Sequence, residues 1–114
     1  MGQAEKVTMI SEIVISEIQI MPVKPKDGLV AFSSCVVNNS ISLNSIAIYS
    51  RPDGKDYRLV YPVKTLSNGK EINIFYPINR EASAIINEAI FKKYEELIEK
   101  VKGDFTNEQE SRVT

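Results

Sequence analysis

The feature that most constrains the fold of this chain is a change of hydrophobic period near residue 77. Before it, short apolar stretches are separated by turn residues, a pattern typical of sheet strands. After it, apolar residues recur at helical spacing, and others widen this stripe to one side. The first set is Ile86, Ile90, Leu97 and Val101, and the widening set is Phe91, Tyr94 and Ile98. The sequence therefore predicts an α+β fold: an antiparallel, strongly twisted sheet of about five strands, followed by one C-terminal amphipathic helix packed on it.

Signals for the two ends of this helix are present at residues 79 and 103. Asn79 can accept a backbone N–H of the first turn, and Glu81 suits the positive end of the helix dipole. Gly103 stands where a left-handed C-cap belongs, after Lys100 and Lys102 in the last turn. We therefore expect a helix over residues 79–102.

Five strands are predicted before the helix, over residues 13–21, 29–37, 41–48, 57–63 and 72–76. Pro22 and the stretch 25–28 should end the first strand, since proline presets φ and glycine tolerates tight turns. The apolar phase shifts at Asn44 and Ser45, which indicates a bulge in the third strand. Residues 67–69, Ser-Asn-Gly, are the strongest hairpin signal in the chain.

The length of 114 residues favours one domain. We expect an N-terminal extension over residues 1–11, the α+β domain over 12–102 and a polar tail over 103–114. No apolar run reaches the roughly 20 residues that span a bilayer, and the N-terminus lacks a signal-peptide layout. A cytoplasmic protein without membrane partners is expected. The single cysteine, Cys35, is followed by the apolar Val36 and Val37 and is expected to be buried.

The residues needed for most catalytic chemistry are absent from the sequence. It contains no histidine and one cysteine, which removes the commonest general base, histidine-paired nucleophiles and multi-thiolate metal sites. It also has no Gly-rich phosphate loop of the Walker or dinucleotide type. We therefore predict no enzyme activity, no cofactor, no metal and no small-molecule substrate.

Charge is distributed unevenly along the chain although the net charge is only −1. Residues 23–70 carry seven cations against three carboxylates, which gives +7 −3 = +4; the cations are Lys24, Lys26, Arg51, Lys55, Arg58, Lys64 and Lys70. In an up-and-down meander, alternate turns lie at one end of the sheet. Lys24 and Lys26 would then meet Arg51, Lys55 and Arg58, with Tyr57 among them. This cluster is either a nucleic-acid-contacting patch or a set of solvated turns.

The wide apolar stripe of the helix also has two interpretations. Phe91, Tyr94 and Ile98 can contact a second copy of the chain in an isologous homodimer, or they can belong to a deeper monomeric core. An edge strand over residues 13–21 offers another route to a dimer through strand pairing.

Four segments of the sequence resemble the SpoVG (stage V sporulation protein G, septation protein) family. They are residues 18–20 (Ile-Gln-Ile), 43–48 (Leu-Asn-Ser-Ile-Ala-Ile), 61–65 (Tyr-Pro-Val-Lys-Thr) and 76–79 (Tyr-Pro-Ile-Asn), and the last is the most specific. Ala89 and Tyr94 agree as well, so the resemblance covers about residues 14–98. It implies a dimeric cytoplasmic bacterial protein that binds DNA and RNA, affects septation, sporulation and gene expression, and has no enzymatic activity.

Carried over by position, the resemblance gives Lys64 as a lysine that follows the proline of the fourth strand. Thr65 and Leu66 stand where that loop is usually more basic, and Ser83 and Ile85 replace basic residues of the first helical turns. The leading hypothesis is a homodimeric DNA- or RNA-binding regulator that uses Lys64 and Lys70 near the start of the helix, with help from Arg80, Lys55 and Arg58. The alternative is a protein-interaction module on the same scaffold, with nucleic-acid binding weakened or lost.

Overall fold

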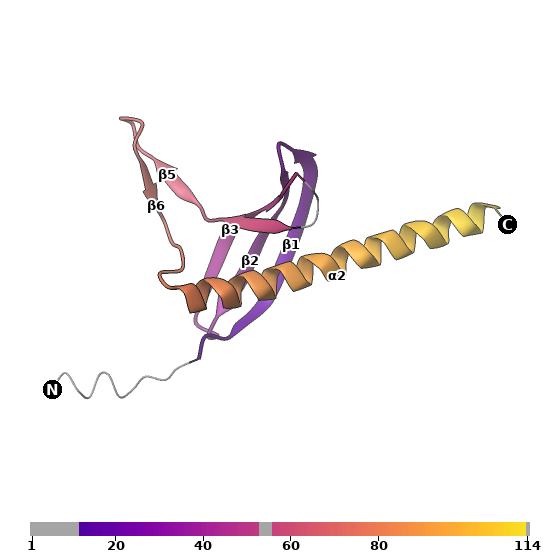
Figure 1. The fold of residues 1–114 in the computed structure, drawn as a ribbon, viewed down its shortest axis with the longest axis horizontal. Helices are drawn as coiled ribbons and strands as arrows, with labels where there is room; N and C mark the ends of the chain where they lie inside the picture. Colours follow the sequence, from indigo (N-terminus) through magenta and orange to yellow (C-terminus); the bar gives the residue numbers. More distant parts are fainter. Residues whose placement is uncertain (1–11, 53–55, 114) are drawn as a thin grey trace.

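The computed structural model describes residues 12–52 and 56–113, with side chains described as far as residue 101. In these described residues six strands precede one helix. Their bounds are β1 Ile15–Lys26, β2 Leu29–Val37, β3 Ile41–Ser50, β4 Tyr57–Val60, β5 Val63–Thr65, β6 Glu71–Asn73 and α2 Arg80–Val113. The first four strands form one antiparallel sheet in the order β1-β2-β3-β4, and β5 pairs with β6 in a separate two-stranded sheet. The predicted α+β class, an antiparallel sheet followed by one packed helix, is confirmed (Figure 1).

Helix α2 lies across one face of the four-stranded sheet and extends past it (Figure 1). The core between the two layers consists of buried side chains from β2, β3 and α2: Ala31, Cys35, Ile46, Ile48, Ile86, Ile90 and Tyr94. Ile86, Ile90 and Tyr94 are four residues apart, so they form one stripe on the helix. The predicted burial of Cys35 is confirmed, with 1% of its surface exposed.

The N-terminus of α2 is capped as the sequence predicts. The side-chain Oδ1 of Asn79 accepts a hydrogen bond from the backbone N–H of Ala82 at 2.8 Å. The carbonyl of Asn79 accepts the N–H of Ser83 at 3.1 Å, the first bond of the helical ladder. Both bonds fix the point where the chain leaves extended geometry and the helix begins.

A bulge in β3 lies at the two residues where the sequence predicts it. Ser33 of β2 pairs with Ile46 and Cys35 pairs with Leu43, so Asn44 and Ser45 together oppose one residue. Ser45 has a φ of 65°, which lets the strand resume its apolar rhythm at Ile46. The buried Ser33 hydroxyl donates to the Ile46 carbonyl at 3.0 Å, which ties the two strands together beside the bulge.

The predicted end of the first strand at Pro22 is wrong, because β1 continues to Lys26. Pro22 pairs in register with Ala31, and the register shifts between Pro22 and Lys26. A proline is tolerated here because β1 is at the edge of the sheet, where a missing donor does not interrupt a central ladder. Asp27 and Gly28, with φ values of 53° and 92°, then make the turn into β2.

The predicted fourth strand is divided by Tyr61 and Pro62 into β4 and β5. The predicted fifth strand is shorter than expected and pairs with β5 outside the four-stranded sheet. The Ser-Asn-Gly hairpin between them is confirmed: Leu66 N–H donates to the Lys70 carbonyl at 2.7 Å, and Gly69 has a φ of 87°. We call β5, β6 and their turn the arm, which projects away from the sheet and helix (Figure 1).

The predicted end of the helix at Gly103 is also wrong, since the helical backbone runs to Val113. Glycine inside a helix is less favourable than alanine by only about 1 kcal/mol, so one glycine does not force a stop. Val101, predicted to belong to the apolar stripe, is 54% exposed and lies outside the core cluster. The domain boundaries at residues 12 and 102 remain predictions.

Candidate nucleic-acid interface

The arm carries two of the predicted contact residues, Lys64 and Lys70, and both are exposed. Lys64 pairs across the arm with Ile72, so the two side chains lie on one face of this small sheet. Lys70 lies at the turn, where its N–H is held by the Asn68 side chain at 2.9 Å. The tip of the arm points away from the start of α2 (Figure 1). Lys70 is therefore not beside the helix start, contrary to the sequence-based expectation.

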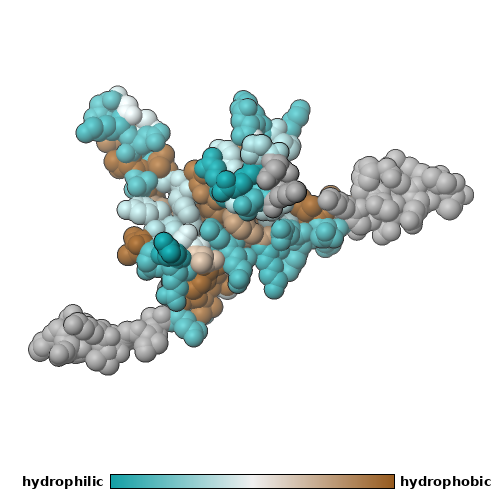
Figure 2. Space-filling model, viewed as in Figure 1, coloured by the Kyte–Doolittle hydropathy of each residue, from teal (hydrophilic) through white to brown (hydrophobic). Residues whose placement is uncertain are grey.

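Apolar side chains are also uncovered on the arm and on the segment that leads from it to α2. Exposed hydrophobic residues there are Val63, Ile72, Ile74, Tyr76 and Ile78, and Ile78 reaches 84% exposure. Figure 2 shows hydrophobic side chains along the arm beneath a hydrophilic tip. Ile74 comes two residues after Ile72, and its backbone N–H donates to the Pro62 carbonyl at 3.2 Å. The apolar face therefore continues to the base of the arm.

The first turns of α2 offer a single described cation, Arg80, whose side chain is exposed. Ser83 and Ile85 are half-buried on the following turn. Glu81 is exposed beside Arg80, so the local charge at the helix start is balanced. This part of the helix therefore offers one described cation to a phosphate.

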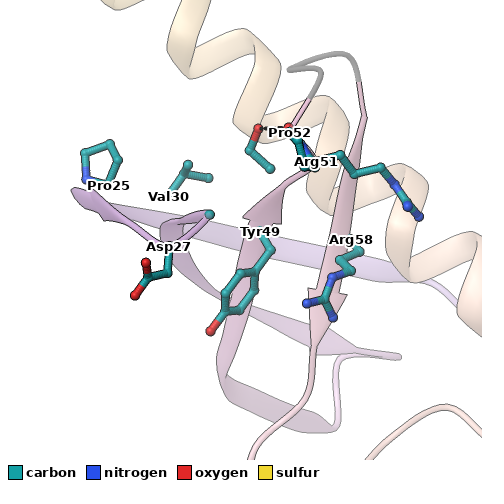
Figure 3. Close-up of a pocket in the computed structure, with 9 residues that line it drawn as sticks. Pro25, Asp27, Val30, Tyr49, Arg51, Pro52 and Arg58 are labelled. Atoms are coloured by element: carbon teal, nitrogen blue, oxygen red, sulfur yellow. Dashed lines mark hydrogen bonds between the residues drawn. The ribbon is translucent and has the colours of Figure 1, made fainter.

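The turns after β1 and β3 meet at one end of the sheet, as predicted for a meander. Ser50 N–H donates to the Gly28 carbonyl at 2.7 Å, and a Cβ on Gly28 would lie 3.2 Å from the Ser50 carbonyl. An open cleft of about 530 Å³ lies between these turns (Figure 3). Its lining residues are Pro25, Asp27, Gly28, Val30, Tyr49, Ser50, Arg51, Pro52 and Arg58. Lys55, predicted for this cluster, lies outside the described residues.

Arg58 is the predicted contact residue that the structure places in this cleft, and its aromatic neighbour is Tyr49. The Arg58 guanidinium carbon lies 5.0 Å from the centre of the Tyr49 ring (Figure 3). The two residues are cross-strand partners on β3 and β4. Arg51 is engaged differently, with its Nε 3.3 Å from a carboxylate oxygen of Asp56.

Tyr57, expected among these cations, instead faces the helix. Its ring contacts Phe91 and Tyr94, with centroid distances of 5.7 and 5.2 Å. Tyr57 pairs with Ser50, one residue beyond Tyr49, and successive residues of a strand point to opposite faces. Sequence reasoning did not identify Tyr49 as a site residue. Its alternation with the apolar Ile48 could have placed it on the face opposite the helix.

The predicted partner-contact residues Phe91, Tyr94 and Ile98 take part in the packing of this chain. Tyr94 is 7% exposed, whereas Phe91 and Ile98 are half-buried against the core. Burial, with a smaller contribution from nearby Tyr57, raises the pKa of Tyr94 above its ordinary value. Little of Tyr94 therefore remains for a partner, and only the outer surfaces of Phe91 and Ile98 are accessible.

An apolar groove of about 220 Å³ lies between the end of the sheet, the segment before α2 and its first turns. Tyr61 and Phe75 line it with their rings at 81° and centroids 6.0 Å apart.

Burial, helped by the nearby Cys35 thiol group, raises the pKa of Tyr61 to about 12. Burial also raises the pKa of the Cys35 thiol, which keeps it protonated and poorly nucleophilic. Within residues 12–52 and 56–101, no cluster of three metal-ligating side chains occurs.

The sheet, its covering helix and an exposed arm with two lysines define a small α+β protein whose geometry is suited to binding. The SpoVG family model matches residues 13–96, most of the chain and nearly the same span as the sequence resemblance. The chain therefore belongs to the SpoVG family, a family of non-enzymatic regulatory proteins associated with septation and sporulation. A search among curated proteins finds no match. In the described part of the chain, no helix has the length and apolarity needed to cross a membrane.

Proposed function

We propose that this chain is a cytoplasmic, non-enzymatic regulator that binds DNA or RNA as a homodimer and acts in septation or sporulation. Membership of the SpoVG family is the observation that carries this proposal. The exposed lysines of the arm, Lys64 and Lys70, support it because an ammonium group free in solvent is available to a phosphate. Arg58 and Arg80 add exposed cations on two other elements, and Lys55 adds one in the sequence.

Nucleic-acid binding is tested by fluorescence anisotropy with single-stranded DNA, RNA and duplex DNA at low salt. The double variant Lys64→Gln/Lys70→Gln should bind less tightly and should lower the slope of log affinity against log salt by about 1.4 on single strands. The matched control is Lys92→Gln/Lys93→Gln, which removes two exposed lysines from α2 instead. Absence of salt-sensitive binding by the unaltered protein to any of the three nucleic acids would refute this function.

The homodimer is proposed through the apolar face of the arm. An isolated two-stranded hairpin is marginally stable in water, yet Ile72 and Ile74 are 47% and 59% exposed on this one. A second copy packing against Ile72 and Ile74 would bury their apolar surface and stabilise the arm, while Lys64, which shares the face of Ile72, would keep its ammonium group in solvent at the rim of the contact. An isologous contact needs only this one surface, repeated on both copies.

Light scattering at micromolar concentration tests the dimer. Ile72→Lys, which places a second cation opposite Lys64, and Ile74→Glu should each convert a dimer to a monomer, because a buried charge without a partner is strongly unfavourable. Val101→Glu is the control, since Val101 is similarly exposed but lies on α2 away from the arm. A monomer from the unaltered chain, or dimers that persist in both arm variants, would count against the proposed contact.

A second function, binding of a protein partner on the same scaffold, is favoured by the neutral start of α2. Ser83 and Ile85 carry no charge there, and Ile78 just before the helix is almost fully exposed. A pull-down that resists nuclease and is abolished by Ile78→Asp would support this function over the first. Phe91→Asp is unsuitable for this test because Phe91 packs on Tyr57 and its loss would destabilise the fold.

A further inference from the structure

The face of the four-stranded sheet opposite α2 carries side chains that the core does not use. Residues that are paired across neighbouring strands point their side chains to the same face of the sheet. The pairing register therefore identifies the rows of side chains on this face. One row runs Met21, Phe32, Ala47 and Val60, and the next runs Lys26, Leu29, Tyr49 and Arg58. Each row crosses all four strands. The described residues include one helix, and it covers the other face. We call this surface the open face.

Two aromatic rings lie on the two central strands of the open face. Phe32 is on β2 and Tyr49 is on β3, and both are half-buried. Phe32 is the partner of Ala47, two residues before Tyr49, so the rings are diagonal neighbours about 7–8 Å apart at their Cα atoms. Phe32 is not packed against the core cluster. The rings therefore form a small aromatic platform on the side of the sheet away from the helix.

Cations stand at both ends of the row that contains Tyr49. Lys26 is exposed on β1 and Arg58 is exposed on β4, where its guanidinium already lies over the Tyr49 ring at 5.0 Å. The described residues of the segments 24–27 and 51–58 carry four cations and two carboxylates, +4 −2 = +2. The platform therefore lies in a positive field, and a polyanion fits it better than a neutral partner does.

The charge pattern disfavours a second copy of the chain that packs about a two-fold axis along the strands. If two copies packed open face to open face about an axis along the strands, β1 of one would oppose β4 of the other. Lys26 would then face Arg58 twice, and like charges brought together are unfavourable. An extended polyanion that also carries flat rings suits this face better. Its negative groups can lie at the two edges of the sheet, near the cations, and its rings can lie over the aromatic residues in the middle.

We propose that single-stranded nucleic acid lies across the open face. Bases stack on Phe32 and on Tyr49, and the Arg58 guanidinium moves off the Tyr49 ring to hold a phosphate, as Lys26 does on the other side. A four-stranded sheet with exposed aromatic rings is an established way to stack two or three bases of single-stranded RNA. Duplexes do not fit this surface, because their bases are already stacked on each other. This proposal rests on the proposed nucleic-acid binding, and it adds the strandedness and a second surface distinct from the arm.

The test measures the affinity of variants for a labelled 12-nucleotide oligo(U), oligo(dT) and a 12-base-pair duplex. Phe32→Leu and Tyr49→Leu keep an apolar side chain but remove the aromatic face, so each should weaken single-strand binding about 5- to 100-fold. Tyr49→Phe should bind like the unaltered protein. Tyr76→Leu is the matched control, since Tyr76 is an exposed aromatic residue outside the platform. Duplex affinity should change less than twofold in every variant.

The outcomes separate this proposal from the proposed function. If the unaltered protein binds single strands and both leucine variants bind equally well, the platform is overturned while nucleic-acid binding stands. If the leucine variants instead change the oligomeric state with unchanged binding, the open face is an interface between copies and the proposal is overturned. If no nucleic acid is bound at all, both proposals fail together. Circular dichroism checks folding, and should Phe32→Leu not fold, the pair Tyr49→Leu and Tyr49→Phe decides alone.

Discussion

The ring of Tyr57 stands edge-on to the ring of Tyr94, with centroids 5.2 Å apart and planes at 81°. This pair joins β4, the edge strand next to the arm, to the middle of α2. Edge-to-face pairs contribute about 0.5–1.5 kcal/mol beyond the burial of their surface. Tyr57 and Tyr94 therefore help to fix the helix across the sheet.

A double-mutant cycle on this pair should show coupling. Tyr57→Leu and Tyr94→Leu should each lower the free energy of unfolding by about 1–3 kcal/mol. The double variant should lose about 0.5–1.5 kcal/mol less than the sum, because the second change no longer removes the aromatic contact. Urea unfolding measures all four proteins. Strict additivity would show that the rings do not interact.

Removal of the helix cap should destabilise the protein without changing its fold. In Asn79→Ala the N–H of Ala82 loses its 2.8 Å acceptor, and the free energy of unfolding should fall by about 1 kcal/mol. Asn79→Asp keeps an acceptor and adds favourable charge at the helix N-terminus, so it should be at least as stable as the unaltered protein. Thermal unfolding followed by circular dichroism distinguishes the two, and equal midpoints for Ala and Asp would contradict the capping role.

The hydroxyl of Tyr61 is buried and has no hydrogen-bond partner among the described residues. Tyr61→Phe removes that polar group while retaining the ring that contacts Phe75. Because an unpaired buried hydroxyl is unfavourable, the variant should be more stable by up to about 1 kcal/mol. A decrease of similar size in urea unfolding would mean that the hydroxyl has a partner in solution.

Stability should also depend on alkaline pH through the same side chain. The pKa of Tyr61 is raised from 10.0 to about 12 in the folded chain, so the folded state retains a proton that the unfolded state releases. The contribution of this proton to the free energy of unfolding is fully present below pH 10 and is lost as the pH rises through about 12. The melting temperature should fall across this range, and less steeply in Tyr61→Phe. A residual slope should remain, because burial also raises the pKa values of Tyr94 and Cys35.

Gly103→Ala tests the continuation of α2 beyond the predicted stop. In a helical backbone, alanine is favoured over glycine by about 1 kcal/mol, so helicity measured by circular dichroism should rise or stay equal. A left-handed cap at this position would give the opposite result, because alanine is strained at positive φ. A loss of helicity would support the sequence-based prediction that the helix ends at Gly103.

The elements with strong local signals were predictable from the sequence. β2 has the predicted bounds, the β3 bulge lies at Asn44 and Ser45, and the helix begins after Asn79. Each of these depends on a local property: alternation, a change of phase or a capping side chain. The family assignment also followed from short segments in order along the chain, and the family model matches nearly the same span.

The errors arose where tertiary context decides the outcome. Pro22 breaks a central strand but is tolerated in an edge strand, and the sequence does not say which strand is at the edge. Pro62 separates β4 from β5 and directs the arm away from the sheet, although both sides of it have strand character. For the candidate site, Lys64 and Arg58 were found as exposed cations, whereas Tyr49 was missed because Tyr57 was assigned to its place.

The edge strand β1 also limits how this protein can assemble. Pro22 and Pro25 have no backbone donor, and Glu17, with a φ of 47°, marks another interruption of the strand near its start. A further strand approaching this edge would meet an incomplete ladder, which is a known protection against open-ended growth of sheets. The four-stranded sheet is thereby protected against templating fibres along β1 even when the protein is concentrated. Contacts between copies of this protein must then form through side-chain surfaces. Such contacts can be regulated, and they stop growing once each surface has its partner.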